Sequence, residues 1–252
     1  MEKGVVVEER ASDIKTSSHS KLSMMINGSK AGIAIAIGYI PIAITFGLIS
    51  KSSEIPSYAS IIMSILVFAG ASQFIGVNLI YNGASIIEIA LTTFILNFRH
   101  FLMSSSLSQR ISENTSKKVL SILAFGITDE TFAVASLREE EKMNPWFIIG
   151  LNLIAFLSWV LGTVVGVFLG YALPEALKSS MNIALYSMFI GFLIPSLKDS
   201  PPTFVVVAIA ITTNCIIKWV PIISFISMGW SIIISTVLAA IIGALMFPRE
   251  VE

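Results

Sequence analysis

The chain has 252 residues, of which 55% are hydrophobic and 13% charged, and its mean hydropathy is +0.85. A soluble domain carries about 25% charged residues and could not bury this much apolar surface, so the composition indicates a membrane protein. Sixteen basic and sixteen acidic residues leave no net charge, which gives no sign of nucleic-acid binding. The single cysteine, Cys215, excludes an internal disulfide framework and a thiolate metal cluster.

The polar start of the chain, residues 1–29, lacks the long apolar core of a secretory signal peptide. We predict a cytoplasmic tail here, a transmembrane domain over residues 30–247 and a short C-terminal tail over residues 248–252. The apolar segments predict an all-α, polytopic membrane helix bundle with seven or eight transmembrane segments, some of them broken at proline or glycine. An inverted repeat is left open, because the first four segments carry most of the polar residues.

Basic residues predict which side of the membrane each end faces. Eight crossings would put both termini on one side, and five basic residues up to Lys30 favour the cytoplasm for that side. The bias is modest, since Arg110, Lys117 and Lys118 would then lie on the other side. A second segment that re-enters instead of crossing would bring these three back to the cytoplasm, and both topologies stay open.

The first expected span, about Lys30 to Ser50, has Pro41 at its middle. Proline has no N–H, so the carbonyl of Ile37 loses its helical donor. The result is either a simple kink or a broken helix whose freed carbonyls face a substrate or an ion.

The second expected span, about Ser57 to Tyr81, is interrupted by the small and polar sequence Phe68-Ala-Gly-Ala-Ser-Gln-Phe74. Gly70 permits close approach of another backbone, and helix packing alone would explain it. Ser72 and Gln73 need hydrogen-bond partners away from water, and an amide in lipid is costly. Helix packing explains Gln73 less well than the glycine, so we favour a role for Gln73 in lining a functional site.

The third expected span, about Ala84 to Ser106, carries two polar stripes at helical spacing. One comprises Glu88, Thr92, Arg99 and Ser106, and the adjacent one comprises Thr93, Asn97, His100 and Ser104. A polar wedge this wide cannot face lipid throughout. Glu88 and Arg99 could instead reach toward an interface, or Glu88 could favour a helix N-terminus. His100 has no second membrane histidine to join it, so we expect no metal site.

The fourth expected span, Val119–Leu137, puts Asp129 and Glu130 near the middle of a hydrophobic run. An ionised acid at the centre of a membrane helix costs about 2.5–3.5 kcal/mol, whereas the nine large apolar residues of the run return about 3–5 kcal/mol. Neighbouring helices, a watery cavity or bound protons must therefore shelter the two acids. Because adjacent residues differ by about 100° around a helix axis, one acid can face a polar pathway while the other forms an ion pair, for instance with Arg99.

The remaining expected spans carry fewer polar residues than the first four. The fifth, about Pro145 to Leu173, repeats small residues every four positions, namely Ser158, Gly162, Gly166 and Gly170. This stripe predicts tight helix contact, either inside the chain or with a partner. The sixth span covers about Ser180 to Pro195, and Thr203–Pro221 and Ile222–Phe247 form the last two.

Four polar motifs follow one another along the chain, namely Gly38-Tyr-Ile-Pro-Ile-Ala-Ile-Thr-Phe-Gly47, Phe68-Ala-Gly-Ala-Ser-Gln-Phe74, Asn97-Phe-Arg-His100 and Phe125-Gly-Ile-Thr-Asp-Glu-Thr-Phe132. In order and separation they resemble the AzlC-type branched-chain amino acid permease family, over about Lys30 to Phe247. The resemblance implies a permease, not an enzyme, that exports branched-chain and related apolar amino acids across the cell membrane without a cofactor. It also implies a small AzlD-type membrane subunit as partner, for which the stripe of the fifth span is a candidate contact face.

The residues themselves fit such a substrate. The ammonium of zwitterionic leucine needs a carboxylate, its carboxylate needs a cation or a helix N-terminus, and its side chain needs an apolar wall, for which Phe46, Phe74 and Phe132 are available. The residues expected to line the site are Pro41, Gly70, Ser72, Gln73, Asn97, Arg99, His100, Thr128, Asp129 and Glu130. We expect the last two to relay protons, which would make the export proton-coupled.

Two other functions are weighed against coupled transport. A passive channel would have the same polar lining without coupling to a proton gradient. Gly70-Ala-Ser72 also resembles the nucleophile turn of rhomboid-type intramembrane serine proteases, with His100 as the base, but that family has glycine where this chain has Gln73. The sequence holds no His-Glu-x-x-His motif, which excludes the zinc metalloproteases that carry it.

Overall fold

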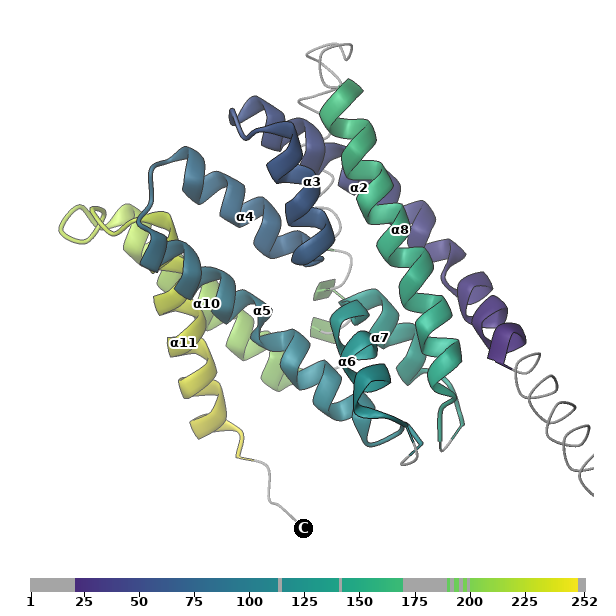
Figure 1. Cartoon of the computed structure of the whole chain (residues 1–252). Coiled ribbons are helices and arrows are strands. Elements are labelled where there is room, and N and C mark those ends of the chain that lie inside the picture. The colour runs from purple at the N-terminus through teal and green to yellow at the C-terminus, as the bar shows by residue number, and fades with distance from the viewer. Residues whose placement is uncertain are drawn as a thin grey trace, which may run out of the picture.

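The computed structural model describes residues 21–112, 115–140, 142–169, 190, 193–194, 197–198 and 200–248. These residues form helices joined by short turns, and no strand occurs among them. The labelled helices are α2 (Ile33–Ser52), α3 (Ser57–Leu66), α4 (Gly70–Tyr81), α5 (Ile86–Ser108), α6 (Lys117–Gly126), α7 (Asp129–Ser136), α8 (Pro145–Leu169), α10 (Pro201–Trp219) and α11 (Met228–Met246). The predicted all-α membrane bundle is confirmed, since five of these helices are long and apolar enough to cross a membrane (Figure 1).

The parallel pair of α2 and α8, which run in the same direction, forms the centre of the fold (Figure 1). A Cβ atom on Gly47 of α2 would lie 2.5 Å from the carbonyl oxygen of Thr163, and one on Gly162 of α8 would lie 2.7 Å from Cβ of Ala43. Real Cβ atoms essentially never come this close to such neighbours. The two helices therefore pack at this distance only because glycine stands at these positions.

Pro41 does not break α2, which continues as one helix from Ile33 to Ser52. One turn further along, Thr45 donates its hydroxyl hydrogen to the carbonyl oxygen of Pro41 at 2.8 Å. Packing against α8 and neighbouring helices holds α2 together across the missing hydrogen bond, as is common for proline in membrane helices. The alternative of a broken helix end at Pro41 is therefore wrong.

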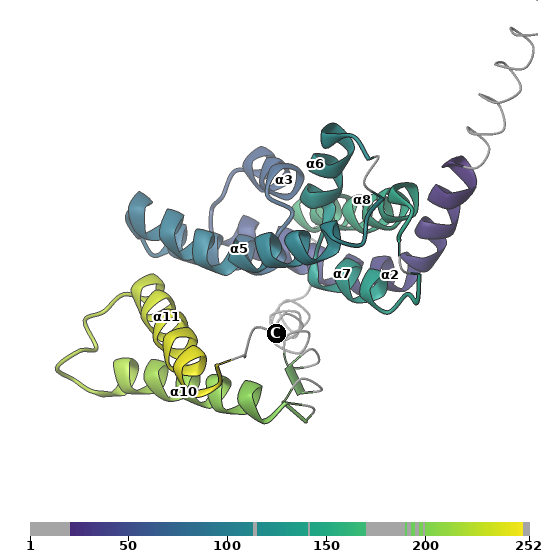
Figure 2. The ribbon, with the colours of Figure 1, turned by 90° about the horizontal axis from the view of Figure 1, so that it is seen from below.

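The C-terminal helices α10 and α11 form a hairpin that lies apart from α2 and α8 (Figure 2). Within the described residues, its main contact with the remaining helices is made by α11 on α5. The eighth expected segment begins as a turn, because α11 starts only at Met228. The sixth expected segment, about Ser180 to Pro195, falls almost wholly outside the described residues.

The second expected span is two short helices, α3 and α4, joined at residues 67–69. The joint contains Phe68, whose φ of 45° lies in the left-handed region and redirects the chain. Neither helix is long enough to cross about 30 Å of hydrocarbon. α3 leads inward from the end of α2, where Ser50 and Ser60 are hydrogen-bonded, to Ser64 beside Thr163 of α8. After the joint the chain reverses and α4 leads back outward (Figure 1), so the pair enters the membrane and returns to the same side.

The fourth expected span also consists of two helices, because α6 and α7 meet at an angle of 115°. Ser116, just before α6, and Trp146, at the start of α8, line one cavity. The ammonium of Lys21, which precedes α2, lies over the ring of Trp146, so α6 begins at the end of the bundle where α2 begins. α7 ends at the same end of the bundle, since Arg110 donates to the carbonyl of Ser136 at 3.1 Å and its own carbonyl accepts from Met143 at 2.7 Å. This segment therefore re-enters, in contrast to the single crossing that its hydropathy predicted.

The re-entrant course of both segments changes the distribution of charge. Arg110, Lys117 and Lys118 lie at the end of the bundle where α2 begins, which we call the proximal end. The other end, where α2 finishes and α5 begins, is the distal end. These three basic residues therefore lie on the same side as Lys30, as the alternative with a re-entrant second segment predicted. Among the described residues the expected number of seven or eight crossings is not reached, because five helices are long enough to cross and the fourth segment re-enters as well.

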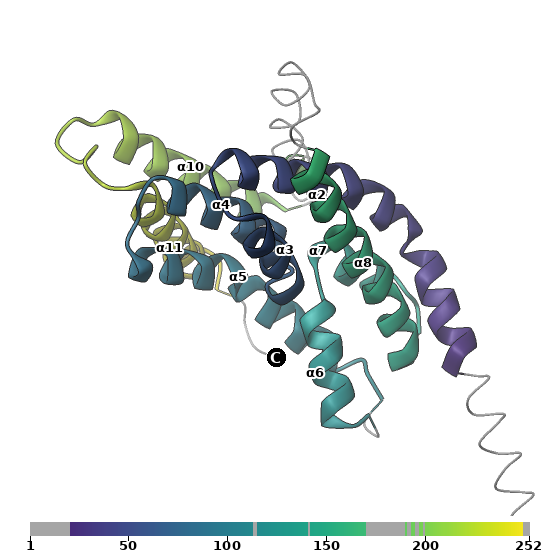
Figure 3. The same ribbon diagram turned by 45° about the horizontal axis from the view of Figure 1, so that its top comes forward.

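The two re-entrant pairs come from opposite ends, and their turns approach each other between α5 and α8 (Figure 3). The ring of Phe68 packs 6.3 Å from that of Phe125 on α6 and 5.2 Å from that of Phe156 on α8. A spanning helix followed by a re-entrant pair thus occurs twice, in α2–α4 and again in α5–α7 with the opposite orientation. This is the element order of the inverted repeat that the sequence left open.

Candidate functional site

The start of α7 forms the polar centre of the molecule. Thr128 is the N-cap, and it exchanges hydrogen bonds with Thr131 in a capping box. Asp129 and Glu130 occupy the first turn, where the positive end of the helix dipole favours carboxylates. The two acids therefore sit at a helix start beside the central joint, and not along the side of a spanning helix.

Each acid has a partner on a different spanning helix. Asp129 pairs with Arg99 of α5, with 2.6 Å between Oδ2 and Nη1. Glu130 accepts a short hydrogen bond from the hydroxyl of Tyr39 on α2, and the same hydroxyl lies 2.7 Å from Oγ1 of Thr128. The charge of Asp129 is thus balanced by a guanidinium, whereas Glu130 is held by neutral groups.

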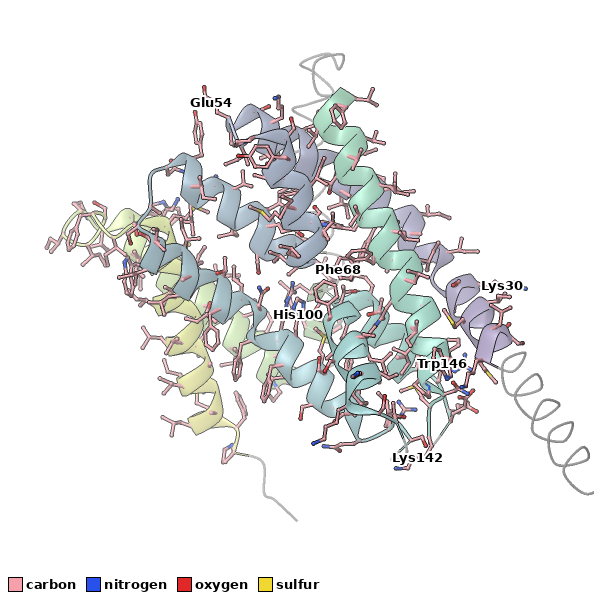
Figure 4. The ribbon with its side chains drawn as sticks, in the orientation of Figure 1. Lys30, Glu54, Phe68, His100, Lys142 and Trp146 are labelled. Carbon is pink, nitrogen blue, oxygen red and sulfur yellow. The ribbon has the colours of Figure 1, made fainter. Side chains whose placement is uncertain are left out.

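A small pocket brings these groups together with an apolar wall. It is lined by Tyr39, Phe68, Ala69, Gly70, Ala71, Arg99, His100, Thr128, Asp129, Glu130 and Trp159. His100 and Phe68 lie near each other at the centre of the molecule in Figure 4. The volume of about 20 Å³ has room for about one water molecule, so nothing larger fits in this conformation.

Gln73 does not line the pocket, although we favoured that role for it. Its side chain is only 1% exposed and its amide is engaged on both sides. Nε2 donates to Oγ of Ser64 at 2.9 Å, and Oε1 accepts from the indole N–H of Trp159 at 3.0 Å. Ser64 is also 2.8 Å from Oγ1 of Thr163, so a chain of hydrogen bonds fastens α3 and α4 to α8. Gln73 thereby fixes the indole that forms one wall of the pocket.

Three further predicted site residues also lie outside the pocket lining. Ser72 donates a short hydrogen bond to Oδ1 of Asn97, which joins α4 to α5. The serine–histidine pair of the protease alternative is not formed, because the hydroxyl of Ser72 turns to Asn97 and not to His100. Pro41 lies on an exposed position of the continuous helix α2. Of the predicted lining residues, the pocket brings together Gly70, Arg99, His100, Thr128, Asp129 and Glu130.

The stripe of small residues on α8 faces α2. Gly162 lies against Ala43, and a Cβ atom on Gly166 would collide with the carbonyl of Ile44. Ser158 is buried and donates to the carbonyl of Ala155 at 2.7 Å, while Gly170 lies outside the described residues. Because α2 occupies this face, Gly162 and Gly166 are not available to a separate protein.

Sequence reasoning missed five residues that line the pocket, the small Ala69 and Ala71 and the aromatic Tyr39, Phe68 and Trp159. Tyr39 and Phe68 lie inside motifs that were singled out, beside residues that attracted attention by their charge or their small size. Trp159 carried one signal, since tryptophan prefers membrane interfaces and this one lies in the middle of a spanning helix. A buried indole N–H needs an acceptor, which could have linked it to Gln73.

The sequence of the chain matches a known protein family and several known membrane proteins. The family described as AzlC protein matches residues 34–173. The Escherichia coli inner membrane protein YgaZ is 34% identical over 177 residues, which cover 68% of this chain and 72% of that protein. An uncharacterized membrane protein of Archaeoglobus fulgidus is 34% identical over 181 residues, or 71% of this chain and 78% of that protein.

A more distant relative is the branched-chain amino acid transport protein AzlC of Bacillus subtilis. It is 26% identical over 140 residues, which cover 55% of this chain and 54% of that protein. No solved structure matches the chain. The family match spans α2 to α8, which are the helices that build the pocket. The chain is therefore a membrane protein of the AzlC family.

Proposed function

We propose that this protein exports branched-chain and related apolar amino acids across the cell membrane, with proton coupling. The observation that carries the proposal is the pocket at the start of α7, where an acid–guanidinium pair and a second acid face aromatic rings. A zwitterion with an apolar side chain needs this combination of groups. The name of the Bacillus subtilis relative supports the same class of substrate.

Each part of the substrate has a counterpart in the lining. Glu130, which has no cationic partner in the described part of the chain, suits the ammonium. Arg99 and the start of α4 at Gly70 suit the carboxylate, because a helix N-terminus offers free N–H groups. Phe68 and Trp159 offer the apolar wall. The contacts of the indole with Gly70 and Gln73 keep this wall in a fixed orientation.

The small volume of the pocket favours a carrier over a passive channel. A space for about one water molecule cannot hold leucine, so the substrate needs a second conformation with a wider pocket. The joints at residues 67–69 and at Ile127 lie beside the pocket and belong to pairs that reach it from opposite sides. Broken helices of this kind are where transporters commonly bind substrate and open to one side at a time.

Proton coupling is assigned to Asp129 and Glu130. The two acids differ in their partners, since Arg99 balances Asp129 and the Tyr39 hydroxyl holds Glu130. Protonation of Glu130 would remove a charge that no cation in the described part of the chain compensates, whereas protonation of Asp129 would take away the anionic partner of Arg99. We therefore expect Glu130 to bind and release the coupled proton and Asp129 to hold the arginine in place.

We assign the N-terminus to the cytoplasm. Basic residues gather at the proximal end, and cytoplasmic ends of membrane helices carry an excess of them. They are Lys21, Lys30, Arg110, Lys117, Lys118, Arg138 and Lys142, against Lys51 and Lys218 at the distal end.

A small AzlD-type membrane subunit is the proposed partner. The family resemblance supports it, and the stripe on α8 is not its contact face, because Gly162 and Gly166 pack against α2. The contact must lie on a face that α2 and α8 do not use with each other.

Leucine flux in sealed vesicles tests the proposal. Wild-type protein, co-expressed with its small subunit, is expected to accumulate leucine against its gradient when a pH gradient is imposed. Glu130→Gln is expected to abolish the pH-driven component, and Asp129→Asn, tested singly, to lower it by about tenfold or more. Undiminished pH-driven flux in both variants would contradict proton coupling through these acids, and flux that only equilibrates leucine would point to a channel. A serine-reactive fluorophosphonate label that is lost in Ser72→Ala would point to the protease.

A further inference from the structure

Glu88 is a buried acid on α5 that the proposed transport site does not use. Its side chain is 5% exposed, although it lies in the first turn of α5 at the distal end. The carboxylate oxygen Oε1 accepts a hydrogen bond from the backbone N–H of Gly229 at 3.0 Å and a short one from the hydroxyl of Ser227. Both donors belong to the start of α11, so Glu88 caps a helix from another part of the chain.

The fit between α5 and α11 depends on a glycine. A Cβ atom on Gly229 would lie 2.5 Å from Oε1 of Glu88 and 2.8 Å from Oγ1 of Thr92. Thr92 is fully buried at this contact, and its hydroxyl has no hydrogen-bond partner among the residues that the structure describes. The hydroxyl of Thr92 therefore adds no hydrogen bond there, and the carboxylate of Glu88 supplies the polar contacts between the two helices.

The same face of α5 carries the arginine of the transport site. Glu88 and Arg99 are eleven positions apart, which is about 16 Å along a helix and a rotation of only about 20°. One end of the stripe is thus fixed to α11 by Glu88, and its middle is paired with Asp129 of α7 by Arg99. Because α5 is a continuous helix, a rotation or shift at Glu88 moves Arg99 as well.

We propose that Glu88 is a positioning residue for transport, which anchors α5 on the C-terminal hairpin and so sets where Arg99 meets Asp129. The inference rests on the proposed function of the pocket. The hairpin α10–α11 lies beyond residue 173, where the family match ends. Its contact with α5 gives this part of the chain a role in the site even though it supplies no lining residue.

The experiment uses the full chain with Cys215→Ser, so that an introduced thiol reports alone. Glu88→Ala removes the acceptor, and Glu88→Gln keeps an oxygen that can accept from Ser227 and Gly229. Thr92→Val is the matched control, because it removes a buried hydroxyl that has no partner. Two quantities are measured for each variant: the KM for leucine in vesicles, and the rate at which a small methanethiosulfonate reagent labels the thiol of an added His100→Cys substitution.

We expect Glu88→Ala to raise the KM by about 3- to 30-fold and to change the labelling rate by a similar factor, in the range of measured couplings between distant sites. Glu88→Gln and Thr92→Val should leave both quantities within about twofold of their parent proteins. In an Arg99→Lys background, Glu88→Ala should raise the KM by clearly less than it does in the parent, because both changes act on one ion pair.

Three results would overturn the inference. Glu88→Ala could lower the melting temperature and leave the KM and the labelling rate unchanged, which would reduce Glu88 to a structural contact. Glu88→Gln could abolish pH-driven export, which would make Glu88 a proton carrier. The effects of Glu88→Ala and Arg99→Lys could multiply without interaction. If wild-type protein moved no leucine, the proposed function would fail, and the labelling rate alone would still decide on Glu88.

Discussion

Arg99 of α5 and Asp129 at the start of α7 form an ion pair with 2.6 Å between the nitrogen and oxygen atoms. The neighbouring Glu130 accepts a hydrogen bond from the hydroxyl of Tyr39 on α2. The first turn of α7 is thus held by two spanning helices at once. Any motion of this re-entrant helix that widens the pocket must break or carry along one of these contacts.

The Arg99–Asp129 pair should matter more for transport than for stability. Its side chains are 33% and 35% exposed, so solvent screens part of their attraction. We expect Asp129→Asn to lower leucine transport by about tenfold or more, since a charged hydrogen bond contributes about 1.5–3 kcal/mol at a site that must bind a zwitterion. The melting temperature in detergent should fall by only a few degrees. A large loss of stability with normal transport would contradict this assignment.

The indole of Trp159 should set the size of the accepted side chain. Its ring forms part of the pocket wall, and a Cβ atom on Gly70 would lie only 2.7 Å from it. Trp159→Ala is expected to favour phenylalanine over leucine by about tenfold relative to wild type, in competition assays of leucine export. Trp146→Ala, at the proximal end of the same helix, is the control and should leave the ratio unchanged.

Gln73 should contribute to stability through its two hydrogen bonds. Gln73→Leu leaves the buried N–H of Trp159 without an acceptor, so we expect the free energy of unfolding to fall by about 1–3 kcal/mol. Gln109→Leu changes an exposed glutamine at the end of α5 and should have little effect. Denaturation of both variants in detergent measures the difference. Equal stability of the two would show that the amide network is not what fastens α4 to α8.

Two glycines of the central helices should respond in opposite ways to the same substitution. Gly166→Ala brings a Cβ atom against the carbonyl of Ile44, and overpacking of this kind costs about 1–3 kcal/mol. Gly38→Ala on α2 meets no atom within 4 Å, so the better helix propensity of alanine should make it neutral or stabilising. Melting temperatures of the two variants provide the comparison. A similar loss in both would mean that α2 and α8 are not packed as closely as described.

The sequence was sufficient for the membrane class and for most of the polar groups of the pocket. Acids and an arginine in apolar segments are costly, so their need for one another could be inferred without coordinates, and the pairing of Asp129 with Arg99 was among the stated possibilities. The cap at Thr128 is also local, because Thr128, Asp129, Glu130 and Thr131 together favour the start of a helix. The cap follows from interactions between residues close in the chain, and the pairing of charges follows from the high free-energy cost of an unpaired charge in hydrocarbon.

Tertiary structure alone decided the direction of the second and fourth segments. Hydropathy measures how much apolar surface a segment has, and a crossing and a re-entrant pair of the same length have similar values. The turn at Phe68 and the joint before Thr128 depend on packing against α8 and α5, which no local pattern encodes. The same holds for Gln73, Glu88 and the glycine stripe, because a polar or small residue predicts that a contact exists, while only the folded chain selects the partner.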